Sequence, residues 1–184
     1  MTPVDFVKFA FQTTRDEFSA GCPCLFLVGT QTVTRPRAVH RTIEFSSAAL
    51  DLTPPPKQGT APHPVISATP PSVQVPVAYA IRKAKDGFTQ MITVGRTPNS
   101  DIMIGDLQVS KFHAFFRETE EGLLLSDAGS RNGTFVSTER LVAKAKPTPV
   151  SIGASISFGK LRFSLLDARR CWDFLRRQTP TPEP

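Results

Sequence analysis

The feature that most constrains this chain is a series of nine short apolar stretches between residues 77 and 165, separated by turn residues. Each stretch has three to six residues, and the joints between them include Asp86-Gly87, Glu121-Gly122 and Asn132-Gly133. Many short strands at close, regular spacing are typical of an all-β protein. The pattern therefore predicts an all-β sandwich or barrel over this half of the chain. The stretches are 77–81, 90–94, 101–104, 112–117, 123–125, 134–136, 150–152, 155–158 and 161–165.

A proline-rich segment precedes this region. Residues 54–76 hold 8 of the 17 prolines, among Ser, Thr, Ala and Gln. Proline has no backbone N–H and restricts the residue before it, so neither a helix nor a central strand is expected. The segment predicts a semi-extended linker.

The N-terminal region, residues 1–53, has a less certain fold. Apolar residues recur at helical spacing over 2–20, and short strands are expected at 25–28 and 42–45. About fifty residues make a marginal core on their own. We therefore expect the N-terminal helix and strand to pack against the β region or against another chain.

A second helix is expected after the β region, over residues 167–178. Its apolar residues, including Cys171 and Leu175, fall on one face, and its arginines lie mostly on the others. The same arrangement favours a packing role for Cys171 over a chemical one. Residues 179–184, with the sequence TPTPEP, predict a disordered tail.

The chain is basic, with 22 Lys and Arg against 16 Asp and Glu. This raises nucleic acid or a smaller anionic ligand as a partner. Residues 77–166 hold 12 of the basic and 8 of the acidic residues, so most of the excess lies there. No basic run with interleaved aromatic residues is present, which argues against nucleic acid.

Several other functions are disfavoured. The three Cys and three His are scattered, so no metal or other cofactor is expected. The low, odd cysteine count fits a reducing cytoplasm, and we expect a cytoplasmic protein with no signal peptide and no membrane contact. Paired carboxylates, a nucleophile–base set and a Gly-rich nucleotide loop are all missing, so an enzyme is not expected.

Polar and basic residues recur at the ends of the predicted strands. Five short elements follow in order: Val94-Gly95-Arg96, Asn99-Ser100-Asp101-Ile102, Val109-Ser110-Lys111-Phe112-His113-Ala114, Leu125-Ser126-Asp127 and Gly129-Ser130-Arg131-Asn132-Gly133-Thr134-Phe135-Val136. If their loops gather at one end of a sandwich, they form a donor-rich, anion-binding surface without a general base.

The order and spacing of these elements resemble those of the forkhead-associated (FHA) domain, over about residues 77–166. The resemblance implies a β-sandwich of about 10–11 short strands that binds phosphothreonine in peptides. The whole chain would then be an FHA-type sandwich with an N-terminal helix and strand segment and a C-terminal amphipathic helix.

The resemblance also implies roles for individual residues. Arg96 and Ser110 match the pair that contacts the phosphate, and a guanidinium and a hydroxyl suit a dianion. Lys111 would add a point charge, and Arg131 could reach the phosphate or the peptide. Asn132 matches the residue that hydrogen-bonds the peptide main chain.

A second set of matched positions is architectural. Gly95 allows a close approach of the chain, and His113 is expected to form hydrogen bonds within the loops and to position Ser110. Gly133 and Thr134 shape the turn after the asparagine. Asp127 is expected to brace a loop as an acceptor.

Simpler interpretations remain for the site residues. Arg96, Lys111 and Arg131 could be ordinary solvated cations, Ser110 a turn residue and Asn132 a hairpin residue. His113 has neither a nucleophile nor a second ligand beside it, so a catalytic or metal-binding role is disfavoured.

The function predicted from the sequence is a phosphothreonine-binding signalling or adaptor module in Ser/Thr kinase signalling. Its partners would be phosphothreonine-containing proteins, the substrates of such a kinase. The alternative is a phosphate-independent structural interaction domain in a larger assembly. A further hypothesis is that a phosphorylated N-terminal or linker threonine of the same chain occupies the site. The threonines considered are Thr30, Thr32, Thr34, Thr53, Thr60 and Thr69.

Overall fold

The computed structural model describes residues 3–34, 72–84, 90–143 and 146–178. The contacts discussed below lie within residues 3–31 and 74–178, which belong to one compact unit. The predicted strand at 42–45 and the predicted tail at 179–184 lie outside the described residues. In chain order the elements are α1 (Pro3–Gln12), α2 (Arg15–Gly21), β1 (Leu25–Thr34), β2 (Ser72–Ile81), β3 (Ile92–Gly95), β4 (Ile102–Met103), β5 (Ala114–Thr119), β6 (Gly122–Asp127), β7 (Thr134–Val136), β8 (Glu139–Arg140), β9 (Thr148–Val150), β10 (Ser155–Phe158), β11 (Leu161–Leu166) and α3 (Ala168–Gln178).

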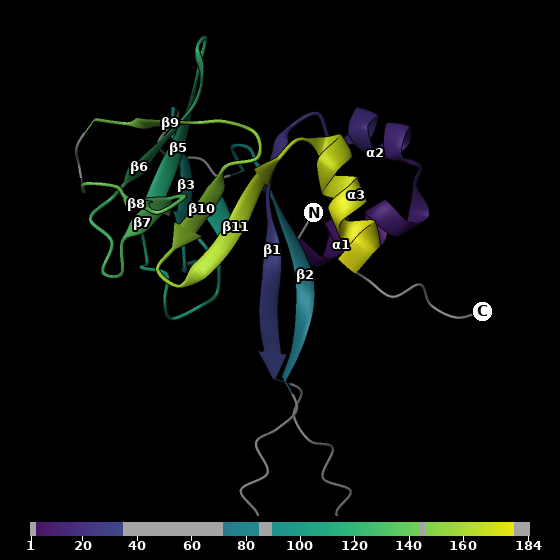
Figure 1. The fold of residues 1–184 in the computed structure, drawn as a ribbon, viewed down its shortest axis with the longest axis horizontal. Helices are drawn as coiled ribbons and strands as arrows, with labels where there is room; N and C mark the ends of the chain where they lie inside the picture. Colours follow the sequence, from purple (N-terminus) through teal and green to yellow (C-terminus); the bar gives the residue numbers. More distant parts are fainter. Residues whose placement is uncertain (1–2, 35–71, 85–89, 144–145, 179–184) are drawn as a thin grey trace, which may run out of the picture. The chain divides into compact units, whose positions relative to one another are not determined.

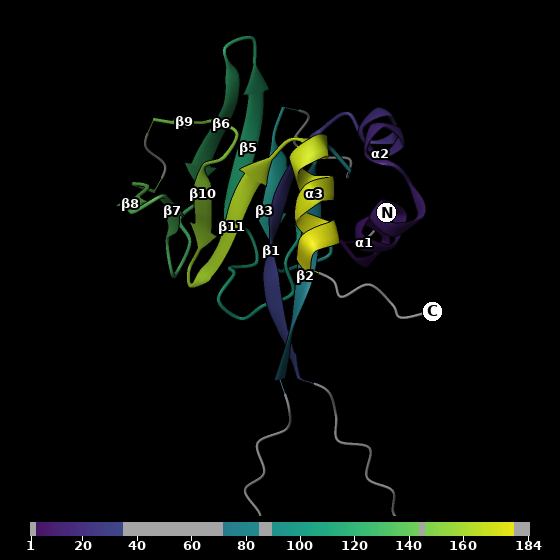
Figure 2. The ribbon, with the colours of Figure 1, turned by 45° about the vertical axis from the view of Figure 1, so that its right-hand side comes forward.

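Two sheets pack face to face as a β-sandwich (Figures 1 and 2). Sheet A has the strand order β2-β1-β11-β10-β7-β8, and sheet B has the order β4-β3-β5-β6-β9. Apolar side chains from alternate positions of both sheets meet between them, among them Leu27 and Phe163 of sheet A and Val94 and Phe116 of sheet B. The predicted fold class, a sandwich of 10–11 strands with short flanking helices, is confirmed.

The register of sheet B aligns three strand ends. β3 and β5 are antiparallel, with Val94 opposite Ala114. β5 and β6 are also antiparallel, with Ala114 opposite Asp127. The end of β3, the start of β5 and the end of β6 therefore lie at the same end of the sheet. The loops that follow or precede these ends are the ones that carry the predicted site.

The N-terminal strand is part of the sandwich. β1 pairs antiparallel with β11, with Phe26 opposite Leu166, and it lies between β11 and β2 in sheet A. It extends well beyond the predicted 25–28. Because side chains alternate along a strand, Leu27 enters the sandwich core while Phe26 and Val28 face the other way.

A second apolar core lies on that other face, under the three helices (Figure 2). The Phe26 ring contacts the rings of Phe6 in α1 and Phe18 in α2, with centroid separations of 5.2 and 5.9 Å. Cys171 and Leu175 of α3 are buried in the same core. The amphipathic C-terminal helix that the sequence predicts thus covers an extension of sheet A.

The N-terminal helix differs from the prediction. The apolar periodicity predicted one helix over 2–20, whereas the structure has two, α1 and α2. The break lies at Thr14, whose side chain accepts a hydrogen bond from the Glu17 backbone N–H. The Glu17 carboxylate accepts in return from the Thr14 backbone N–H, at 2.8 Å. This capping box begins a new helix and lets α2 turn away from α1.

The predicted linker, 54–76, also differs from the structure at its end. Residues 72–76 belong to β2, a strand at the edge of sheet A. Pro76 lacks a backbone N–H, but an edge strand has one side without a strand partner and tolerates proline there. The two-residue strand β8 was not predicted, because it is too short to show a pattern.

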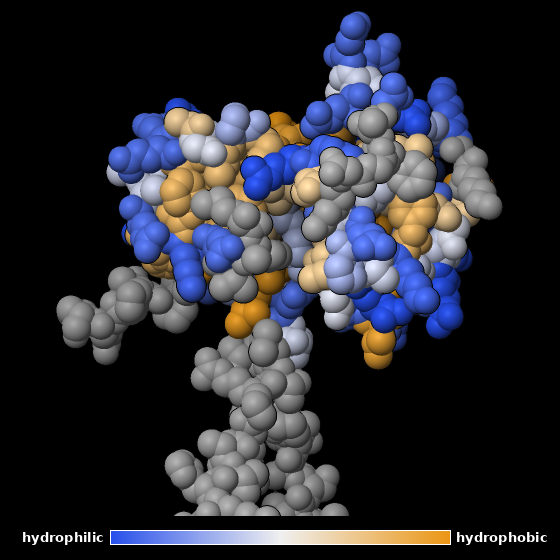
Figure 3. All heavy atoms as spheres, turned by 180° about the vertical axis from the view of Figure 1, so that it is seen from behind, coloured by the Kyte–Doolittle hydropathy of each residue, from blue (hydrophilic) through white to orange (hydrophobic). Residues whose placement is uncertain are grey.

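Among the described residues, the exposed large apolar side chains are Met103, Leu107, Phe112, Val142 and Ile152. The most exposed are Leu107, at 84%, and Val142, at 74%, in separate loops. Figure 3 shows hydrophilic and hydrophobic residues interspersed on one face. Within the described ranges, no helix is long and apolar enough to cross a membrane.

Candidate functional site

Three loops meet at the aligned end of sheet B. Arg96 follows β3, Ser110 and Lys111 precede β5, and Arg131 and Asn132 lie between β6 and β7. Direct hydrogen bonds join the loops. The Arg96 backbone N–H donates to the Ser110 carbonyl at 3.0 Å, and the Arg131 backbone N–H donates to Ser110 Oγ at 3.1 Å. The structure thus brings together the residues that the sequence proposed for one site.

The Arg96 side chain is half-buried, and one hydrogen bond fixes its guanidinium group. Its Nε donates to the carbonyl of Val109 at 3.2 Å. A guanidinium has five N–H donors, and the four on its terminal nitrogens make no bond to a described residue. Arg96 therefore presents a fixed pair of donor nitrogens at the loops.

Ser110 is positioned by a buried histidine. His113 is fully buried, and its Nδ1 accepts a hydrogen bond from the Ser110 backbone N–H at 3.0 Å. Its Nε2 lies 3.2 Å from the Gly133 carbonyl, so Nε2 carries the proton and the ring is neutral. Burial lowers the pKa of His113, against the opposing effects of the Gly133 hydrogen bond and the Asp127 charge. His113 therefore links the β4–β5 and β6–β7 loops without contributing a charge.

The two other cations of the site are exposed. Lys111 and Arg131 form no ion pair with any described residue. With Arg96, they are the three basic residues of the loops that the hydrogen bonds to Ser110 join. Such a cluster repels itself unless an anion is present, so it favours an anionic ligand.

Asn132 is oriented by the β4–β5 loop. Its Nδ2 donates to the backbone carbonyl of Gln108 at 2.8 Å and lies 3.4 Å from the Gln108 side-chain oxygen. Both donors are therefore occupied, and the side-chain oxygen remains available to accept a backbone N–H. Gln108 was not singled out in the sequence, since nothing in its local pattern marks it as a partner of Asn132.

Glycines occupy the closest approaches between the loops. A Cβ on Gly95 would overlap the Lys111 carbonyl oxygen and lie 2.5 Å from Ser100 Oγ. Gly133 has a φ of +82°, which disfavours any larger residue. Its carbonyl accepts from the Gly159 N–H at 2.9 Å as well as facing His113.

Asp127 braces the β6–β7 loop. Its carboxylate accepts hydrogen bonds from the backbone N–H groups of Gly129 and Ser130 and from two hydroxyls, Ser130 Oγ and Thr134 Oγ1, each at 2.6 Å. Burial by itself would raise the pKa of Asp127, but these four hydrogen bonds outweigh it and lower the pKa. The carboxylate stays charged, yet it is turned into the loop and buried, so it does not compete for the three cations.

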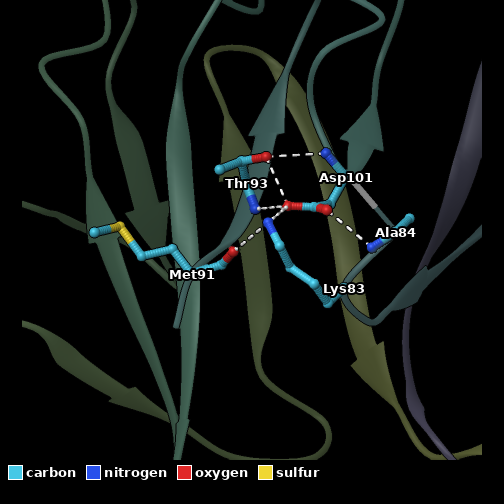
Figure 4. A network of polar contacts seen from close by, with 5 residues as sticks. All are labelled: Lys83, Ala84, Met91, Thr93 and Asp101. Atoms are coloured by element: carbon cyan, nitrogen blue, oxygen red, sulfur yellow. Dashed lines mark hydrogen bonds and ion pairs between the residues drawn. The ribbon is translucent and has the colours of Figure 1, made fainter. Parts of the chain in front are cut away.

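A second buried carboxylate holds the start of β4 (Figure 4). Asp101 accepts from the Thr93 backbone N–H and hydroxyl and from the Ala84 N–H, all at 2.8 Å, and pairs with Lys83 at 2.9 Å. Burial raises the pKa of Asp101, but these bonds together lower it well below the ordinary range. Asp101 lies in the second of the five sequence elements, but no role was predicted for it. Its hydrogen-bond partners come from other segments of the chain and are not visible in the local pattern.

The described residues of the site offer mainly hydrogen-bond donors. The residues at the loops supply N–H and O–H donors and positive charge, and the buried His113 is tied at both ring nitrogens. No group of three or more His, Cys, Asp or Glu in the described part of the chain is arranged to hold a metal ion.

Residues 92–159, which contain these strands and loops, match the family model of the FHA domain. This part of the chain is therefore an FHA domain, as the sequence predicts.

Comparison with curated proteins gives relatives that share this domain. The chain is 42% identical over 74 residues to the oxoglutarate dehydrogenase inhibitor of Corynebacterium glutamicum, covering 40% of this chain and 49% of that protein. It is 37% identical over 78 residues to the glycogen accumulation regulator GarA of Mycobacterium tuberculosis, covering 42% of this chain and 46% of that protein. The chain thus spans about half the length of the curated relatives it matches.

Two solved structures of FHA domains are similar to part of this chain. The FHA domain of the CT664 protein from Chlamydia trachomatis is 24% identical, covers 49% of this chain and 83% of that chain, and has a TM-score of 0.40. The FhaA FHA domain complexed with the intracellular domain of Rv3910 is 21% identical, covers 47% and 87%, and has a TM-score of 0.39.

Proposed function

We propose that this chain is a phosphothreonine-binding adaptor or regulator in Ser/Thr kinase signalling, and that it acts in the cytoplasm by binding and not by catalysis. The observation that carries the proposal is that Arg96, Lys111 and Arg131 lie on loops joined through Ser110, with no ion-pair partner among the described residues. The names of the relatives, an inhibitor and a regulator, support a regulatory role.

In this proposal each residue has one task. The free guanidinium donors of Arg96 and the Ser110 hydroxyl bind the phosphate, which is a dianion above its second pKa of about 6. Lys111 and Arg131 add charge at the rim of the site. The free side-chain oxygen of Asn132 accepts a backbone N–H of the peptide. His113, Gly95, Gly133 and Thr134 hold the loops in register.

The hypothesis of a ligand from the same chain is narrower than the sequence suggested. Thr30, Thr32 and Thr34 all lie within β1, a strand of sheet A, and not in a loop. Thr53, Thr60 and Thr69 lie outside the described residues. Kinase treatment that left the affinity for an external peptide unchanged would reject this hypothesis.

The test is a titration of the full chain with an oriented library of phosphothreonine peptides at pH 7.5, followed by single peptides in matched phosphorylated and unphosphorylated forms. Arg96→Ala should weaken binding of the phosphorylated peptide by about 30-fold or more, because it leaves the phosphate without its main donors. The matched control is Arg177→Ala, which removes an exposed cation of α3 and should leave affinity unchanged.

Two outcomes would overturn the proposal. The first is equal affinity for the phosphorylated and unphosphorylated forms of a peptide, because the three basic residues would then not be binding a phosphate. Association with a native partner that survived Arg96→Ala would favour the alternative, a phosphate-independent interaction domain. Steeply salt-dependent binding to random DNA would instead revive a nucleic-acid function.

A further inference from the structure

A cavity of about 490 Å³ opens at the other end of sheet B. It is lined by Lys83, Gln90, Met91 and by the last residues of β5, Arg117, Glu118 and Thr119. Met91 precedes β3, whose other end leads to Arg96, and Thr119 ends β5, whose start follows Lys111. The cavity is thus separated from the phosphate loops by the length of two strands, and it belongs to no part of the site described above.

Arg117 is the unusual residue of this cavity. Its Nε is buried and has no hydrogen-bond partner. The rest of the guanidinium likewise makes no hydrogen bond or ion pair with a described residue. A buried N–H on a charged group that lacks a partner destabilises the folded state, and protein structures rarely leave one. The position therefore contributes something other than stability.

The other charges at the cavity do not satisfy Arg117. Lys83 is already occupied, since its Nζ contacts the Asp101 carboxylate at 2.9 Å and the Met91 carbonyl at 3.1 Å (Figure 4). Glu118 is the next residue along β5, and successive side chains of a strand point to opposite faces. Glu118 also lines the cavity, but it forms no ion pair with Arg117. Among the described residues, no carboxylate forms an ion pair with Arg117.

We propose that this cavity, the Arg117 cavity, binds the carboxylate of an aspartate or glutamate side chain from an acidic segment of a protein partner. A carboxylate carries one negative charge, which balances one guanidinium, and its two oxygens match the planar guanidinium fork. A phosphate dianion carries more negative charge than one guanidinium balances. Gln90 and Thr119 supply neutral donors beside the guanidinium.

The proposal does not depend on the phosphate loops. A partner bound at the Arg117 cavity would add a second contact to any peptide held at the other end of the domain. It would also allow a phosphate-independent association in which Arg96 takes no part.

The experiment is a titration of the ¹⁵N-labelled full chain, followed by the Nε–Hε resonances of arginine. The probe is the peptide acetyl-Ala-Glu-Ala-amide, which contains neither threonine nor phosphate. Arg117 Hε is identified by its loss in the Arg117→Lys spectrum. We expect a saturable shift of this resonance and of the backbone amides of Met91 and Thr119, unchanged in Arg96→Ala. Arg117→Lys, which keeps the charge but loses the fork, should weaken binding about tenfold.

The control variants separate binding from folding. Arg177→Lys, a matched change at an exposed arginine on α3, should leave the titration unchanged. Arg117→Met should abolish binding while keeping or raising the melting temperature, because it removes an unsatisfied buried donor. The proposal is wrong if the peptide gives no saturable shift in the cavity, or if the shift survives Arg117→Met. Tighter binding of inorganic phosphate than of the peptide at this cavity would overturn the assignment to a carboxylate.

Discussion

The apolar core under the helices, around Phe26, predicts that the helices and the β-sandwich unfold together as one unit. Phe26 is fully buried, and its ring joins α1 and α2 to the strand that pairs with β11. Replacing it with alanine removes the ring and leaves a cavity. Truncation of a buried phenylalanine costs about 3–5 kcal/mol. That is a large share of the roughly 5–15 kcal/mol by which folded domains are stable.

The assay is urea unfolding followed by two probes. Trp172, the only tryptophan, donates its ring N–H to the Thr13 carbonyl and so reports on the helical layer through its fluorescence. Circular dichroism in the β-sheet region reports on the sandwich. With a urea m-value of about 2 kcal/mol/M, Phe26→Ala should lower both midpoints together by about 2 M. Leu107→Ala, at a highly exposed position, should change the free energy of unfolding by less than about 0.5 kcal/mol.

The reasoning would be refuted by a split result. If Phe26→Ala moved only the fluorescence transition and left the sheet transition in place, the helices and the sandwich would be separate folding units. Coincident transitions would mean that the N-terminal strand, α3 and the FHA domain unfold as one.

Three further predictions concern the loops. Gly95→Ala should destabilise the domain and weaken phosphopeptide binding, since the new methyl group would overlap the Lys111 carbonyl; thermal unfolding and peptide titration would check both, and unchanged affinity would contradict the contact. For His113 the folded-state pKa lies below the unfolded value of about 6.5, so the unfolded chain binds more protons below that pH. The free energy of unfolding should therefore fall as pH decreases from 7 toward 5, by at most about 1.4 kcal/mol per pH unit, and a flatter profile is expected in His113→Gln. Asp101→Ala should cost about 3–5 kcal/mol in urea unfolding, because it leaves Lys83 without its carboxylate partner and two backbone N–H groups without an acceptor; a loss below about 1 kcal/mol would show that water replaces the carboxylate.

Much of the site was predictable because its signals are local. Asn132-Gly133 predicts a turn with positive φ, and Gly133 has one. The alternation of apolar residues placed Arg96, Ser110 and Asn132 outside the strands, where they are found. That Lys111 and Arg131 are exposed also follows from their chemistry. The assignment of these residues to phosphate binding remains a prediction.

Other features could not be predicted, because their partners are distant in sequence. Nothing near Asp101 indicates that Lys83 and Thr93 will surround it. The periodicity over 2–20 is helical on both sides of Thr14, and only the capping box with Glu17 separates two helices. The missing partner of Arg117 likewise depends on which side chains the sheet brings beside it.

The sequence by itself determined the β-sandwich, the order of its loops and the residue types at the phosphate-type site. These follow from side-chain alternation, turn chemistry and hydrogen-bonding capacity, which act between near neighbours. Only the tertiary structure decided that β1 belongs to sheet A, that the helices cover a second core on Phe26, and that Arg117 Nε is buried without a hydrogen-bond partner among the described residues. The physical reason is that burial and pairing are set by residues far apart in the chain, whose meeting no local pattern encodes.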